Sequence, residues 1–156
     1  MNNWTALNVT LWCILALLAT GIAAIAIGRA RWARWPVYGA SLTVSVIACA
    51  YSLVHLITQP AVAWATVLPL GLPWIGANFR IDALAAFFLI VINLGAAAAS
   101  LYGLGYGRHE SAPERVLPFF PVFLAGMNMV LLAADAFTFV LSGEFISLAS
   151  WAQVMP

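Results

Sequence analysis

The sequence predicts an all-α membrane protein, a bundle of about five transmembrane helices in one domain covering residues 1–156. Composition is the first observation: 65% of the residues are hydrophobic and 7% are charged, whereas a soluble domain carries roughly 25% charged residues. The second is that apolar runs of about 20 residues, the length that crosses a bilayer, recur along the chain. Polar or proline-rich stretches separate these runs, and we therefore expect each run to be one membrane-spanning helix.

The first two predicted spans are residues 5–27 and 37–57. Both are apolar and long enough to cross a bilayer with some tilt. The basic segment RARWARWP connects them, and its Trp32 and Trp35 suit the level of the lipid headgroups. Small and hydroxyl residues are frequent in the second span, which favours close contact between helices in lipid.

A short connection, residues 58–81, follows the second span. Its prolines and glycines would break a membrane helix repeatedly, so we expect it to lie outside the membrane. Short β-prone pieces such as residues 65–68 predict a small hairpin that lies on the bilayer. Asp82 then fits the first turn of the third span, residues 83 to about 104.

The most polar stretch, YGRHESAPER at residues 106–115, is predicted to be a loop. The fourth span runs from residue 118 to about residue 134, with Pro118 and Pro121 at its start, where a missing N–H costs little. Asp135 marks a tight turn, and the fifth span follows it almost to the end of the sequence.

The arginines predict the orientation of the bundle. Three lie between the first and second spans and two between the third and fourth, whereas the opposite side carries one; in chain order they are Arg29, Arg31, Arg34, Arg80, Arg108 and Arg115. By the positive-inside rule, both basic loops are cytoplasmic. The N-terminus and the hairpin-like connection are therefore expected outside and the C-terminus inside. We expect a multi-pass protein of the cell inner (cytoplasmic) membrane.

Glu144 is an acid deep within the fifth apolar run. A helix that begins after Asp135 places it about 13 Å along the axis, near the middle of a hydrocarbon core of about 30 Å. An ionised acid costs about 2.5–3.5 kcal/mol at a helix centre, so this group must stay protonated, find a partner or face an aqueous cavity. Acids at this depth are functional candidates, and we interpret Glu144 as an intramembrane proton carrier.

Ser45, Asn93 and Asn128 are expected at a similar depth to Glu144 on three other helices, all facing the bundle interior. These side chains can form hydrogen bonds between helices. Alternatively, Asn128 can form a hydrogen bond with a protonated Glu144. Ser147 shares the face of Glu144 one turn later and is a further candidate site residue.

The same face of the fifth span carries Trp151, and Gly143 and Ser147 form a pair of small residues that would let another helix approach closely. The sequence has no lysine, and none of its arginines lies deep in a predicted span. An ionised Glu144 therefore needs a cation from another chain or from further residues.

Other kinds of site find little support. Cys13 and Cys49 lie in apolar runs and are predicted to be packing residues, with neither a disulfide framework nor a zinc site. His55, near the end of the second span, is either an interfacial histidine or a proton relay. A net charge of +1 without a basic cluster argues against nucleic-acid binding. We expect no metal and no cofactor in this chain, and the first residues do not have the pattern of a cleaved signal peptide.

Three stretches resemble a known family: IDALAAFFLIVINL, LYGLGYG and PFFPVFLAGMNMVLLAADAFTFVLSGEFISLASW. Together they resemble the N-terminal part of the antiporter-like membrane subunits of respiratory complex I and its hydrogenase relatives, of the hydrogenase-4 component B or formate hydrogenlyase membrane subunit type. The resemblance covers residues 79–154.

The resemblance implies a non-redox membrane subunit of a hydrogenase-4, formate hydrogenlyase or NADH-quinone oxidoreductase-like complex, coupling electron transfer elsewhere in the complex to proton translocation. In the family a glutamate that matches Glu144 works with lysines on later helices, and the residue before it, Gly143 here, is usually tryptophan. Family members continue through further helices, so we expect this chain to be the N-terminal fragment of a longer subunit. Expected partners are other membrane subunits of the complex and the lipid bilayer. The alternative is a structural or assembly membrane module, or an inactive remnant, that transports no ion.

Overall fold

The computed structural model of the protein describes residues 6–27, 32–68, 76–106 and 113–154. These residues form five helices and one two-stranded hairpin. In chain order the elements are α1 (Ala6–Ile27), α2 (Arg34–Thr58), β1 (Trp64–Leu68), β2 (Ala77–Ile81), α3 (Ala83–Tyr106), α4 (Pro113–Leu132) and α5 (Ala136–Val154). The five predicted helices are thus confirmed, and three of them, α1, α2 and α3, are long and apolar enough to cross a membrane.

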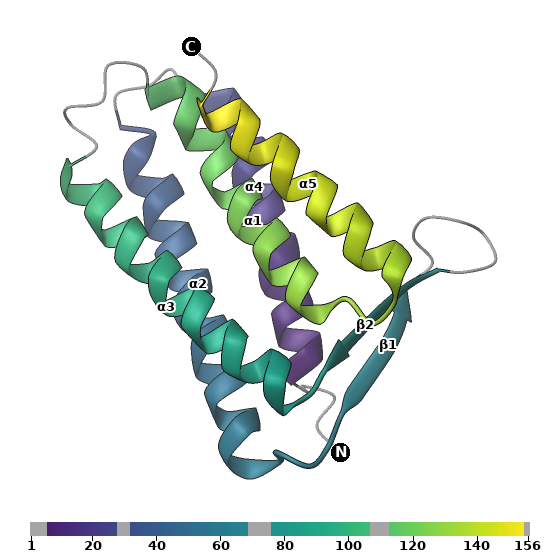
Figure 1. Cartoon of the computed structure of the whole chain (residues 1–156). Coiled ribbons are helices and arrows are strands. Elements are labelled where there is room, and N and C mark those ends of the chain that lie inside the picture. Colours follow the sequence, from purple (N-terminus) through teal and green to yellow (C-terminus); the bar gives the residue numbers. More distant parts are fainter. Residues whose placement is uncertain (1–5, 28–31, 69–75, 107–112, 155–156) are drawn as a thin grey trace.

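The helices pack side by side with their axes roughly aligned (Figure 1). Helix α2 packs along α3 on one side and along α1 on the other, and α1 packs along α4. Helix α5 lies at the edge of this arrangement, where it packs mainly on α4 and touches β2. The main apolar core lies between α1, α3, α4 and the hairpin, with Leu17, Leu89 and Leu132 almost fully buried.

Gly21 brings α1 and α4 close together. A Cβ at this position would collide with Val122 Cγ2 and lie 3.0 Å from the carbonyl oxygen of Pro118. The close contact therefore depends on the absence of a side chain at residue 21, as expected where helices pack through small residues in lipid.

Helix α4 begins earlier than the sequence predicts. Pro113 is its first residue, and Pro118 and Pro121 lie inside the helix instead of at its start. The predicted bounds of the loop, residues 106–115, are wrong at both ends, because α3 extends to Tyr106 and residues 113–115 are helical. Proline is favoured at the first position of a helix, because a backbone N–H there would have no acceptor within the helix. This explains why α4 can begin at Pro113.

The predicted hairpin is confirmed. Strands β1 and β2 pair antiparallel, with Trp64 opposite Ile81 and Leu68 opposite Ala77. Alternate residues of β2, namely Ala77, Phe79 and Ile81, are buried against the helices, as the two-residue period of a strand requires. Phe79 also forms an isolated bridge with Ala133 at the end of α4.

Asp82 caps the first turn of α3, as the sequence predicts. Its Oδ1 accepts a hydrogen bond from the backbone N–H of Ala85 at 2.9 Å, and its Oδ2 pairs with Arg80 at 3.0 Å. The hairpin therefore leads directly into α3.

The two ends of the bundle differ. The hairpin lies at the end where α1 and α3 begin and α4 passes into α5, whereas α5 ends at the opposite end (Figure 1). An odd number of aligned helices produces this arrangement.

Candidate functional site

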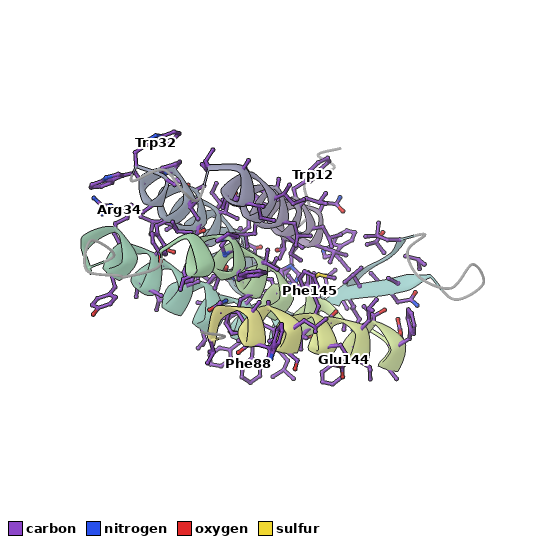
Figure 2. All side chains as sticks on the ribbon, turned by 90° about the horizontal axis from the view of Figure 1, so that it is seen from above. Trp12, Trp32, Arg34, Phe88, Glu144 and Phe145 are labelled. Carbon is purple, nitrogen blue, oxygen red and sulfur yellow. The ribbon has the colours of Figure 1, made fainter. Side chains whose placement is uncertain are left out.

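Glu144 lies on the outer side of α5, exposed, and the prediction that it faces the bundle interior is wrong. The buried residues of α5 are Thr138, Ser142 and Ala149. Two residues correspond to about 200° of rotation around a helix, so Glu144 lies almost opposite Ser142. Figure 2 shows Glu144 on the outer side of α5 and Phe145 on the side of the other helices. No hydrogen bond or ion pair of the Glu144 side chain forms with the described residues.

The face around Glu144 is uncovered within the described part of the chain. Ser147 is exposed, and Leu148 and Trp151 are 65% and 61% exposed. A Cβ at Gly143 would meet nothing within 4 Å. The small-residue pair of Gly143 and Ser147 therefore makes no close contact with another described helix.

A different glycine mediates the contact between α4 and α5. A Cβ at Gly126 would lie 2.7 Å from Ile146 Cγ1 and 3.1 Å from Phe145 Cδ1. Helix α5 thus turns Phe145 and Ile146 toward α4, and this choice of face leaves Glu144 outside.

Asn128 binds Asn93, not Glu144. The Asn93 side-chain amide donates to Asn128 Oδ1 at 2.7 Å and also to the carbonyl of Leu89. Asn128 donates its own amide to the carbonyl of Leu124 at 2.8 Å. Both side chains are almost completely buried. The expectation of an interhelical hydrogen bond at this depth is confirmed, whereas a bond between Asn128 and Glu144 is not formed.

Two other predicted polar residues lie inside the protein on α2. Ser45 is completely buried, as expected, and its Oγ has no hydrogen-bond partner among the described residues. His55 lies near the end of α2 and is 4% exposed, so it is packed within the protein and not open at the surface. Sequence reasoning missed Ser52, which is buried on the same face. Its spacing, seven residues after Ser45 and three before His55, was the signal that could have identified it.

The cysteines are free, with Cys13 buried and Cys49 half-buried. Within the described ranges, no group of three or more His, Cys, Asp or Glu side chains gathers where a metal ion could bind. His109 and Glu110 lie outside the described residues.

Asp135 connects the hairpin to the start of α5. Its carboxylate accepts hydrogen bonds from the backbone N–H and the hydroxyl of Thr138, both at 2.8 Å, and from the backbone N–H of Asn78 at 3.1 Å. These donors, above all the Thr138 N–H, lower the pKa of Asp135 from 3.8 to about 2. The backbone N–H of Ala134 donates in return to the carbonyl of Asn78 at 2.9 Å. An open pocket, lined in part by Thr66 and Val67, lies beside this junction.

The Asp135 junction is expected to loosen in acid. Because the pKa of Asp135 is lower in the folded protein than the ordinary value of 3.8, its contribution to stability is complete above about pH 4 and is lost as the pH falls toward about 2. Hydrogen exchange at the Asn78 amide should therefore accelerate across this range. Asp135→Ala should raise the exchange rate at neutral pH, with only partial protection left by the second acceptor of the Asn78 N–H, Thr138 Oγ1 at 3.2 Å. Asp82→Ala, at the other end of β2, should leave the Asn78 amide protected. Equal protection of Asn78 in the wild type and in Asp135→Ala would contradict this role.

Comparison with known proteins finds relatives that share about half of this chain. No protein-family model matches the sequence. The chain is 38% identical over 80 residues to Hydrogenase-4 component B of Escherichia coli (strain K12), which is 50% of this chain and 12% of that protein. It is also 32% identical over 84 residues to an uncharacterized protein of Mycobacterium tuberculosis, which is 54% of this chain and 13% of that protein.

The similarity thus spans about an eighth of the length of these relatives. It includes half of the present chain, in which the helices α1, α2 and α3 are long and apolar enough to cross a membrane. The chain thus shares a modest similarity, over half of its length, with Hydrogenase-4 component B.

Proposed function

We propose that the chain is part of a membrane subunit of a hydrogenase-4, formate hydrogenlyase or NADH-quinone oxidoreductase-like complex, in which electron transfer in other subunits drives proton translocation. Glu144 is the residue to which we assign the intramembrane proton. One observation carries the proposal: this carboxyl lies exposed among large apolar side chains on the outer face of α5, about 12 Å from the start of that helix.

The surroundings of Glu144 support this role. Leu141, Leu148 and Trp151 are 48%, 65% and 61% exposed around it. A carboxyl among such residues would face hydrocarbon if nothing covered it, which is costly for an acid at the middle of a membrane. We infer that further helices cover this face and that they enclose Glu144 in a polar site.

The cation that pairs with Glu144 comes, in our proposal, from those covering helices. Arg34 is at the beginning of α2, Arg80 is in β2 and Arg115 is in the first turn of α4, so none of these positions lies at the level of Glu144. A buried carboxylate without a cation is strongly unfavourable. A lysine on a companion polypeptide, or on further residues of the same subunit, would complete the proton-transfer pair.

We further propose that all five helices cross the inner membrane, with the N-terminus and the hairpin outside and the C-terminus in the cytoplasm. Helix α5 and the apolar part of α4, Val116–Leu132, are shorter than the other spans. Two features support the orientation: the arginine distribution, and the opposite positions of the α1 start and the α5 end (Figure 1).

The test is reconstitution of the complex in lipid vesicles with and without this chain. We expect vesicles with the chain and the neighbouring gene products to form a pH gradient when electron donor is added, and vesicles without the chain to form none at equal electron-transfer rate. If the gradient forms equally in both, the proton-translocating role is refuted. Stable assembly of the complex only with the chain would then support the alternative, an assembly module.

A further inference from the structure

Buried hydroxyl groups fall into two classes in the described part of the chain. Most donate to the carbonyl one turn earlier on their own helix or, for Thr138, to Asp135; these are Thr10, Ser41, Ser100, Thr138 and Ser142. Ser45 and Ser52 on α2 are equally buried, but their hydroxyls have no partner. Both hydroxyls are therefore turned away from their own backbone and into the interface that α2 makes with its neighbours.

Besides Arg34 Nε at the start of α2, two further buried atoms of the described residues have no hydrogen-bond partner. They are His55 Nε2, three residues after Ser52 on the same face of α2, and Asn93 Oδ1 on α3. From Ser45 to His55 the groups extend over about 15 Å of α2. A buried polar atom without a partner is costly, so four of them on or beside the buried face of α2 point to a bound polar molecule.

Ser45 and Asn93 lie at the same level of the interface. Helices α2 and α3 run antiparallel and side by side (Figure 1). Cys49 Sγ is 3.9 Å from the carbonyl of Ile90, which fixes the register of the two helices. One turn before Cys49 is Ser45, and about one turn after Ile90 is Asn93. The register therefore places a hydroxyl donor on α2 and a carbonyl acceptor on α3 at about the same level, and no hydrogen bond joins the two.

Ser52 and His55 form a second pair. Residues three apart on a helix are neighbours, with Cβ atoms about 5–6 Å apart, a gap that one water molecule spans. The Ser52 hydroxyl can donate to or accept from such a molecule, and a neutral His55 Nε2 can accept from it.

We propose that the buried face of α2 binds ordered water, with one site between Ser45 Oγ and Asn93 Oδ1 and another between Ser52 Oγ and His55 Nε2. Water fits because it both donates and accepts, and because sites of this kind hold buried water in other proteins. A metal ion does not fit, since hydroxyl, amide and imidazole groups supply no negative charge to balance it. One proposed water site lies near the hairpin end of α2, and the other lies beside the hydrogen-bonded Asn93–Asn128 pair. Both are separate from Glu144, which is on the outer face of α5.

Solid-state NMR of the full, isotope-labelled chain in lipid bilayers tests the proposal. Magnetisation is transferred from water protons to the side-chain nitrogens of Asn93 and His55. We expect both nitrogens to receive it as quickly as the exposed side chain of Gln59. Transfer as slow as that to the backbone nitrogen of the buried Leu89 would overturn the proposal.

A matched pair of serine variants separates bound water from general hydration. Ser45→Ala should cause loss of the transfer to Asn93 while His55 keeps its own, and Ser52→Ala should do the reverse. Ser41→Ala should change neither, because this hydroxyl, one turn before Ser45 and equally buried, already binds the Val37 carbonyl at 2.8 Å. Unchanged transfer to Asn93 in Ser45→Ala would contradict the proposed water site between Ser45 and Asn93.

Discussion

Glu144→Gln is expected to abolish proton translocation by the reconstituted complex, reducing the pH gradient to the level of vesicles without this chain. Glutamine has nearly the volume of glutamate, but its amide does not ionise near neutral pH and so cannot carry a proton. Glu144 is exposed, with no hydrogen bond or ion pair to another described side chain, so the substitution should leave the packing of α5 unchanged. The measurement is the vesicle pH gradient during electron transfer, together with the amount of assembled complex.

Leu148→Ala is the control for Glu144→Gln, because Leu148 lies one turn later on the same outer face and is 65% exposed. It should keep the gradient. Glu144→Asp, which retains an exchangeable carboxyl on a shorter side chain, should keep part of it. A full gradient in Glu144→Gln would exclude Glu144 as the proton carrier, whatever the role of the chain in assembly.

Gly21→Leu is expected to cause a large loss of stability. The added Cβ meets Val122 Cγ2 and the Pro118 carbonyl oxygen, and the second of these is backbone that cannot rotate away. Helix α1 must therefore move from α4, and overpacking of this kind costs about 1–3 kcal/mol. The free energy of unfolding in detergent, measured by a denaturant titration, checks the effect.

Gly95→Leu is the matched control for Gly21→Leu. Gly95 is also within a long apolar helix, α3, but a Cβ there meets nothing within 4 Å. Both substitutions gain similar helix propensity, at most about 1 kcal/mol each, so their difference isolates the contact between α1 and α4. Equal unfolding free energies in the two variants would show that Gly21 is not needed for close packing.

Much of the fold is predictable from the sequence because lipid imposes simple rules. An apolar run long enough to cross a bilayer must satisfy its backbone hydrogen bonds internally, so it forms a helix. Prolines and glycines between the second and third runs excluded a helix and indicated the hairpin, which the structure confirms. The start of α4 was placed too late, since Pro113 is compatible with the first turn of a helix as well as with a loop.

The sequence predicted which residue forms the candidate site but not which way its side chain points. Glu144 is an acid within an apolar run, and the sequence alone identifies it. The side of α5 on which Glu144 lies was not predictable. Lipid and the interior of the helix bundle are similarly apolar, so hydrophobic periodicity does not distinguish them. The same limit applies to Asn128, whose partner could be Asn93 or Glu144 until the helices were placed.

By itself, the sequence determined the helices, the hairpin between the second and third of them, and the presence of one acid deep in the fifth. Only the tertiary structure decided which side of α5 packs on α4, because that choice depends on the fit of Phe145 and Ile146 over Gly126. It also decided that Asn93 binds Asn128 and that Ser45, Ser52 and His55 share one buried face. Contacts between residues far apart in the chain depend on the shapes of two surfaces, and a single helix does not encode the shape of its partner.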